Sequence, residues 1–297
     1  MTLQSSGSIS SSQIQTEFGG SNPISMSEYY GLDSGVPTSG PIKFSNFYGK
    51  IINATRTIGS TQNFNARSDF QNNATIVGGK KTSSSVYTNN QAVKYTINVN
   101  GTIGANDTSS YAFDTGTFPS GSSIYLNVYS GNYIVGAGGD GGASNGGAGG
   151  AGGPALILRL ISYITNNGTI AGGGGGGGGG GYGYANGCNQ DGCCHQTCYT
   201  AKADGGVGGG GAGKIAASGA SLLSGGGGGA GYNSTNGNQT ASSGSGGSGG
   251  DLGKKGDDGG SSNGTPGPGS GGAPGNYITN NNYATWLKTG TIIGGVA

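Results

Sequence analysis

The sequence predicts a mainly β and irregular protein, in which a β-strand region joins a sandwich of polyglycine II (PPII-like) helices and short helical turns form the N-terminus. Three observations predict this class: 73 of the 297 residues are glycine, residues 172–181 are ten consecutive glycines, and glycine recurs at every third position from 244 to 259. Three residues per turn is the period of polyproline II, a helix without internal hydrogen bonds. Glycine lets such helices approach closely and bond N–H to C=O between neighbours.

Composition and periodicity divide the chain into four expected units. Residues 1–50 are an N-terminal attachment segment, 51–135 a β-rich domain, 136–275 the glycine-rich sandwich with its distal loops, and 276–297 the returning C-terminal strands. Only 31% of the residues are apolar, so a conventional hydrophobic core can serve only part of the chain. Backbone hydrogen bonds must hold the glycine-rich part together.

The first unit repeats a short theme three times. Each copy has an apolar anchor, a serine three places on that caps a helical turn (Ser12, Ser27 and Ser45), a further apolar residue, and a glycine at the stop. Short capped turns bury little surface on their own. We therefore expect residues 1–50 to dock onto another protein, with a small N-terminal subdomain as the alternative.

Period-two alternation of apolar residues predicts half-buried strands at 93–99 and 124–128. The nearly continuous apolar run at 155–164 predicts one strand that is buried on both faces, because glycine blocks close on either side of it.

A second repeat combines a strand, a turn at glycine, an isoleucine and a return to glycine. It occurs at 97–104, 128–136 and 164–172, and its second half occurs at 290–294. Asn-Gly is a strong turn signal, and similar units along one chain usually stack. The isoleucines are expected to form a small ladder beneath the glycine slab.

Composition also excludes several classes of function. A net charge of +1 predicts no nucleic-acid partner, and no apolar stretch is long enough for membrane insertion. No glutamate follows Glu28, and His195 is the only histidine, so the sequence offers no acid–base pair or catalytic triad. Asp251, Asp257 and Asp258 fit a solvated face of the triplet repeat better than paired catalytic carboxylates. We predict no enzyme activity and no cofactor.

All four cysteines, Cys188, Cys193, Cys194 and Cys198, fall within one loop around His195. Two disulfides are the simplest interpretation, because a bond between the adjacent Cys193 and Cys194 would be strained. Two pairings then remain open: Cys188–Cys193 with Cys194–Cys198, or Cys188–Cys194 with Cys193–Cys198. Free thiols and a zinc site of Cys188, Cys193, His195 and Cys198 are the lesser alternatives, since the spacing is not a common zinc arrangement.

Aromatic residues interrupt the glycine blocks at Tyr182, Tyr184, Tyr199 and Tyr232, and Asn233 follows the last of them. Recognition loops favour tyrosine in the company of Ser, Gly and Asn, because tyrosine offers a large contact area at low entropic cost. We expect these five residues to contact a receptor. Coverage of the slab ends by the same rings is the alternative.

Two stretches resemble proteins of tailed bacteriophages. SGPIKFSNFYGK at 39–50 looks like the openings of phage tail proteins. ITNNGTIAGGGGGGGGGG at 164–181, with the stretch before it at 118–156, resembles glycine-rich domains of phage host-recognition proteins, including the adhesins at long-tail-fibre tips. The resemblance implies a polyglycine II sandwich whose distal loops contact a bacterial surface protein or glycan, and an N-terminal part that is fixed to the tail.

The expected function is therefore that of a phage fibre-tip adhesin that recognises a host receptor. The protein would be made in the host cytoplasm and carried on the virion tail, where residues 1–50 bind a fibre or baseplate protein. The sequence leaves the oligomeric state open, with a trimer as one alternative. One alternative is a structural spacer of the tail or baseplate, and the position of residues 182–240 in the virion separates it from an adhesin. A second alternative is a glycine-rich ice-binding protein, which thermal hysteresis would identify.

Overall fold

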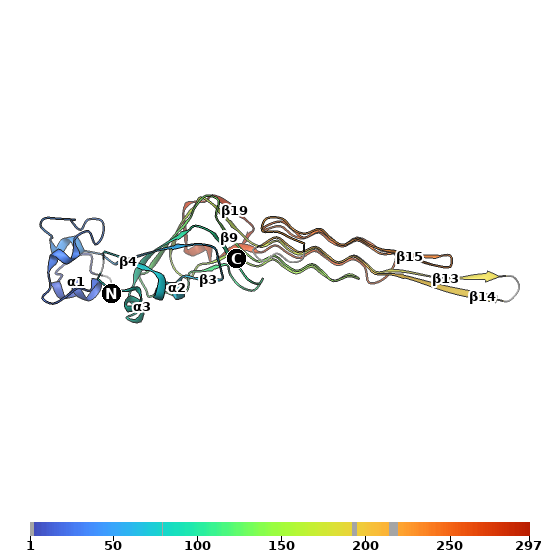
Figure 1. Cartoon of the computed structure of the whole chain (residues 1–297), viewed down its shortest axis with the longest axis horizontal. Coiled ribbons are helices and arrows are strands. Elements are labelled where there is room, and N and C mark those ends of the chain that lie inside the picture. Colours follow the sequence, from blue (N-terminus) through green and yellow to red (C-terminus); the bar gives the residue numbers. More distant parts are fainter. Residues whose placement is uncertain (1–2, 79, 192–194, 214–218) are drawn as a thin grey trace.

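The computed structural model describes residues 3–78, 80–191, 195–213 and 219–297. Figure 1 shows an elongated molecule with a helical N-terminal unit at one end, stacked β-strands in the middle, and a glycine-rich rod that carries two β-hairpins at the other end. The elements are mostly short strands, with few short helices. This confirms the predicted fold class.

The N-terminal unit (residues 3–50) contains helix α1 (Ser11–Phe18) and two 3₁₀ turns, η1 (Met26–Tyr29) and η2 (Phe44–Phe47). Ser10 caps α1: its hydroxyl accepts from the Gln13 N–H, and the Gln13 side chain accepts from the Ser10 N–H. The prediction that Ser12, Ser27 and Ser45 cap the helical turns is wrong, because each lies inside its helix or turn and not before it.

Buried apolar residues of this unit belong to one hydrophobic core that continues into the strands. Phe18, Tyr29 and Phe47 are buried, and the Phe47 ring contacts the other two. Tyr30 and Phe44 remain 38% and 45% exposed. Residues 3–50 are therefore folded and packed onto the rest of the chain, and some of their aromatic surface is still open to a partner.

The strands form five stacked coils, each of which passes once through three sheets. Neighbouring coils pair in parallel, and the inward side chains of each strand alternate with outward ones, so the core lies inside the stack. In chain order the coils are β1 (Ile52–Ile58), β2 (Thr61–Gln62), β3 (Phe64–Asn65); β5 (Val93–Val99), β6 (Thr102–Gly104), β7 (Phe113–Asp114); β8 (Ser123–Val128), β9 (Tyr133–Val135), β10 (Leu156–Ile157); β11 (Ser162–Asn166), β12 (Thr169–Ala171), β17 (Asn276–Thr279); and β18 (Ala284–Lys288), β19 (Thr291–Ile293), β20 (Gly295–Val296).

Several smaller elements flank this stack. Helices α2 (Ala66–Asn73) and α3 (Ser83–Thr88) lie between the first two coils in the chain, and β4 (Thr75–Val77) pairs antiparallel with β1 at the edge of its sheet. A 3₁₀ turn, η3 (Asn281–Tyr283), leads into the last coil. The stack therefore begins beside the helical elements and ends at the C-terminal strands.

The predicted isoleucine ladder is present. Ile103, Ile134, Ile170 and Ile292 stand in register on four neighbouring strands of one sheet. The first three are fully buried. Glycine segments leave the stack directly after two of these strands, β9 and β12, so the ladder supports the base of the rod.

The sheets cross the domain boundaries that composition suggested at 135 and 275. Strands β10 and β17, which follow the glycine segments, return to the sheet of β7 and pair in parallel. The glycine-rich residues are thus two insertions into the third and fourth coils, and residues 276–297 complete the stack. Composition reveals the insertions but cannot reveal the coils that they interrupt.

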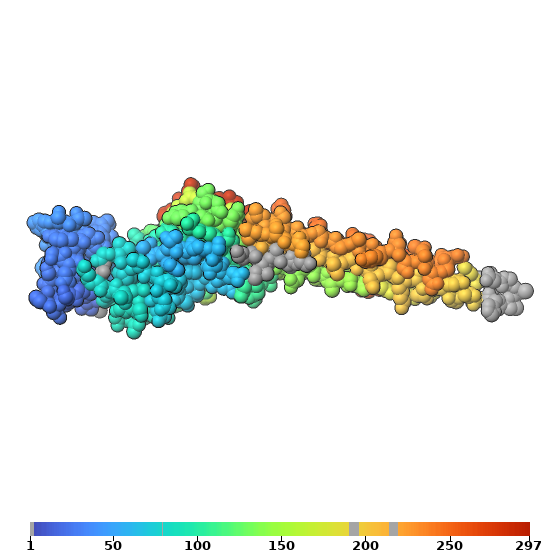
Figure 2. Space-filling view, viewed as in Figure 1, coloured from blue at the N-terminus to red at the C-terminus, as the bar shows by residue number. Residues whose placement is uncertain are grey.

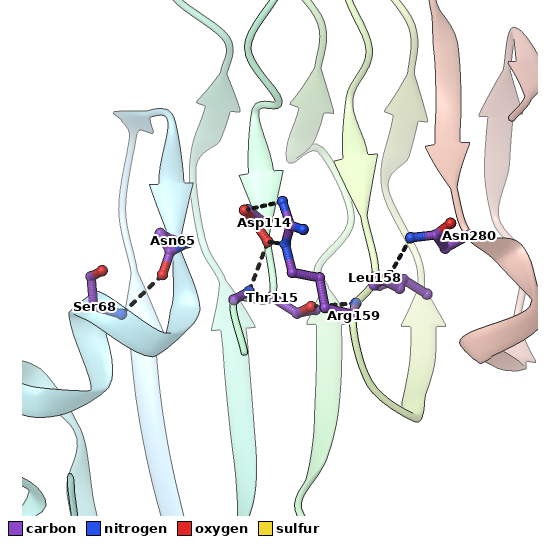
Figure 3. A network of polar contacts seen from close by, with 8 residues as sticks. Asn65, Ser68, Asp114, Thr115, Leu158, Arg159 and Asn280 are labelled. Carbon is purple, nitrogen blue, oxygen red and sulfur yellow. Dashed lines mark hydrogen bonds and ion pairs between the residues drawn. The ribbon is translucent and has the colours of Figure 1, made fainter. Parts of the chain in front are cut away.

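The predicted single strand at 155–164 is wrong, because a corner of the stack divides it into β10 and β11. The Arg159 guanidinium turns outward there and pairs with Asp114, with 2.8 Å between Nε and Oδ1. The Arg159 N–H donates to Oγ1 of the buried Thr115 at 2.8 Å. Figure 3 shows this network, in which polar side chains satisfy backbone groups that a continuous strand would have paired elsewhere.

The run 172–181 lies at the centre of the rod, and all ten glycines are buried. Its N–H and C=O groups bond in steps of three residues; for example, Gly173 and Gly176 donate to the carbonyls of Gly153 and Gly150 at 2.9 and 2.8 Å. This three-residue step confirms the predicted polyglycine II sandwich. Six surrounding segments of the described chain take part: 136–143, 147–153, 206–212, 244–250, 254–260 and 269–275.

Candidate functional site

Two β-hairpins form the end of the molecule that lies farthest from the N-terminal unit (Figure 1). The longer consists of β13 (Gly183–Asp191) and β14 (His195–Ala203), and the shorter of β15 (Asn233–Asn236) and β16 (Gln239–Ser242). Figure 2 shows them at the narrow end of the rod. Because β13 follows the central run 172–181 almost directly, the most constrained segment of the rod sets the direction of the longer hairpin.

The two faces of the longer hairpin differ in character. Its inner face carries small residues where the hairpin leaves the rod, and Ala201 and Ala203 are buried there with Ala241 of the shorter hairpin. Its outer face is exposed and carries the cross-strand pairs Tyr184–Lys202, Asn186–Thr200 and Cys188–Cys198. Small side chains on one face let the hairpins pack closely, so the polar face points to solvent.

The structure separates the five predicted contact residues. Tyr184 is 40% exposed and Tyr232 is 61% exposed, and Asn233 is exposed on β15. Tyr182 is half-buried, and its N–H donates to the carbonyl of Pro266. Tyr184, Tyr232 and Asn233 are thus the three predicted residues that are open to a partner.

Tyr199 has a packing role between the hairpins. Its half-buried ring covers Gly237 in the turn of the shorter hairpin, where a Cβ atom would lie 2.5 Å from the ring. Beside it, the Asn236 side chain donates to the carbonyl of Thr200 at 3.0 Å. This corresponds to the alternative in which an aromatic ring covers the scaffold, and the register of β14 is the reason.

Sequence reasoning missed Asn263, which lies against both hairpins at this end of the molecule. Its side-chain oxygen accepts from the N–H groups of Tyr184 and Ser242 at 3.2 and 3.1 Å, and its amide donates to the carbonyl of Thr240 at 3.2 Å. One amide thus joins both hairpins through their backbones. The Asn-Gly pair at 263–264 marks a turn, but only the fold brings that turn to the hairpins.

A disulfide links Cys188 to Cys198, with 3.9 Å between the Cα atoms. Both predicted pairings are therefore wrong, since hairpin pairing places Cys188 opposite Cys198. The zinc alternative is wrong as well, because the bond removes two of its four ligands. Cys193 and Cys194 lie outside the described residues, as does the His195 side chain.

Replacing Cys188 and Cys198 together by serine is expected to loosen the tip of the longer hairpin while the rod stays folded. The bond spans ten positions of sequence, and closing a loop of that size stabilises by about 2–3 kcal/mol. Amide hydrogen exchange in β13 and β14 should accelerate, and the thermal midpoint of the rod should not change. Wild-type protein under reductant is the matched comparison, and equal exchange in all three samples would contradict the clamp.

The acidic residues of the triplet repeat lie on the outer side of the rod. Lys254 pairs with Asp251 at 3.3 Å, and Lys255 pairs with Asp258 at 2.9 Å. The Gly271 N–H, followed by Lys255, lowers the pKa of Asp258. Within the described part of the chain no three His, Cys, Asp or Glu side chains could hold a metal ion, and no helix is long and apolar enough to cross a membrane.

Comparisons with known proteins agree with this architecture. A family model described as phage tail fibre adhesin Gp38 matches residues 53–297. The fold is similar to that in the crystal structure of the gp37–gp38 adhesin tip complex of the bacteriophage S16 long tail fibre, with a TM-score of 0.51, 21% identity, and coverage of 99% of this chain and 100% of that chain. No curated protein gave a significant match.

The family match covers the coils, the rod and both hairpins, and it begins just after the N-terminal unit. It confirms the resemblance found in the glycine-rich sequence, and it replaces the ice-binding alternative with an adhesin. This chain belongs to the Gp38 family of phage tail fibre adhesins.

Proposed function

We propose that this protein caps a phage tail fibre, attaches to it through the N-terminal unit, and binds a molecule on the host-cell surface with its hairpins. The observation that carries this proposal is the placement of the two ends: the N-terminal unit and the hairpins lie at opposite extremes of an elongated molecule (Figure 1). The protein acts by binding and not by catalysis. It is made in the host cytoplasm and remains on the virion tail.

The attachment role rests on the surface of the N-terminal unit. Tyr30 and Phe44 are exposed although the neighbouring aromatic rings are buried. Exposed aromatic side chains are enriched at protein interfaces, where they supply much of the binding energy. The similar S16 structure is a complex of gp37 with gp38, which supports a fibre protein as the partner of this unit.

The recognition role rests on the stiffness of the rod and the chemistry of its tip. The rod has backbone hydrogen bonds on all sides of its central run, so it holds the hairpins at a set distance and direction. The hairpins display tyrosine, asparagine and threonine, the residue types of recognition surfaces. A rod that served only as a spacer would have no need of this tip chemistry.

One substitution separates the two roles. Full-length protein added to host cells should block adsorption of the phage that carries it. Phe44→Asp should block adsorption equally well, but its affinity for the fibre protein should fall by about tenfold or more. Leu223→Asp is the control, because Leu223 is 49% exposed but follows Leu222, which packs against the ends of β9 and β12 at the base of the rod. Protein that binds the fibre but never blocks adsorption would favour the spacer function.

A further inference from the structure

We infer that the outer face of the longer hairpin binds a phosphorylated oligosaccharide of the host surface. This inference rests on the proposed function and specifies its receptor. We define the tip face by Tyr184, Asn186, Thr200 and Lys202, all of which are exposed on one side of β13 and β14.

The tip face offers an oligosaccharide paired polar groups beside an aromatic ring. Asn186 and Thr200 lie opposite each other, with 3.5 Å between the Thr200 hydroxyl and Asn186 Oδ1. Together an amide and a hydroxyl donate and accept, as the neighbouring hydroxyls of a sugar require. Two residues before Asn186 on the same face, the Tyr184 ring supplies an apolar surface for the C–H side of a sugar.

The charge on this face favours an anionic group on that sugar. Lys202 is the charged residue of the tip face, lies opposite Tyr184, and forms no ion pair with any described residue. By contrast, Lys254 and Lys255 on the side of the rod are paired with aspartates. A phosphate group carries about −1.5 to −2 charges and three strong acceptor oxygens, so it gains more from a single ammonium than a carboxylate does.

The tip face is also held in shape before any ligand arrives. The Cys188–Cys198 bond fixes the strands on one side of the polar pair. On the other side, Asn263 holds the Tyr184 backbone against the shorter hairpin. Rigid presentation lowers the entropic cost of binding, which matters for a small, hydrated ligand with few apolar contacts.

The test measures binding of the full-length chain to oligosaccharide released from host lipopolysaccharide, before and after phosphatase treatment. Phosphatase should weaken binding of the wild type about tenfold or more, the range of one lost charge-assisted hydrogen bond. Lys202→Gln should weaken binding equally and make it insensitive to phosphatase. Lys288→Gln is the control, because Lys288 is also exposed and unpaired among described residues but lies in the last coil. Unchanged thermal midpoints establish that both variants fold.

The possible outcomes separate failure of the phosphorylated-oligosaccharide inference from failure of the proposed adhesin function. If the protein binds host cells but not the oligosaccharide, or if protease treatment of the cell surface abolishes binding, the inference is overturned and the adhesin function stays intact. A surface protein is then the receptor. Equal binding by Lys202→Gln and wild type also overturns it. Protein that binds no host cells overturns both.

Discussion

Replacing Gly176 by alanine is expected to destabilise the glycine-rich rod strongly. A Cβ atom at this position would lie 1.9 Å from the backbone oxygen of Asp140 and 2.5 Å from its carbon. Because these atoms belong to a neighbouring backbone that is itself bonded on several sides, no side-chain rotation relieves the clash. Overpacking of well-packed interiors usually costs about 1–3 kcal/mol, and a clash against backbone belongs at or above the upper end.

The control is Gly227→Ala in an outer segment of the same rod. A Cβ atom there would meet no other atom within 4 Å, and the glycine is exposed. Thermal unfolding and limited proteolysis should show an intact rod for this variant, and a lowered midpoint with cleavage inside 136–275 for Gly176→Ala. Equal stability of the two variants would contradict the view that close backbone packing holds the rod together.

The rod was predictable because its signal is local in sequence. A run of ten glycines and a triplet repeat allow few ordered states, and hydrogen bonds between backbones remain the one stabilising interaction that needs no side chains. The strands at 93–99 and 124–128 were predictable for a similar reason, since their alternation follows the pleat of a half-buried strand.

The coiled stack was not predictable from the same patterns. Each coil turns two corners between its three strands and a third corner into the next coil. The corner at Arg159, which joins the third coil to the fourth, depends on a side chain from the second coil, Asp114. The third strand of two coils also lies far along the chain from its predecessor, as β17 does from β12. Stacking of the repeats was foreseen, but composition hides a coil whose members are separated by an insertion.

The candidate site was likewise predictable only in part. The sequence placed a tyrosine-rich surface between the glycine blocks, and Tyr184 and Tyr232 are indeed exposed. Strand register decides the rest: it turns Tyr199 inward onto Gly237 and places Cys188 opposite Cys198. No composition argument distinguishes one face of a hairpin from the other when both are polar or small.

Replacing Tyr184 and Tyr232 together by alanine is expected to abolish adsorption without loss of stability. Their side chains project at the tip and contribute little to a core, so the thermal midpoint should stay within a degree or two of the wild type. Tyrosines that anchor an interface commonly contribute about 2 kcal/mol or more each, which corresponds to about 30-fold in affinity per residue.

The matched control for this pair is Tyr129→Ala, since Tyr129 is 44% exposed but lies at the end of β8 in the coiled stack. The measurement is the adsorption rate of phage particles that carry each variant, with thermal unfolding of the purified proteins alongside. If the tip tyrosines act through contact, the double variant loses adsorption, Tyr184→Ala and Tyr232→Ala each lose part of it, and Tyr129→Ala keeps it. Normal adsorption by the double variant would show that the receptor contacts another part of the molecule, because a hairpin surface that bound the receptor could not lose both exposed rings without effect.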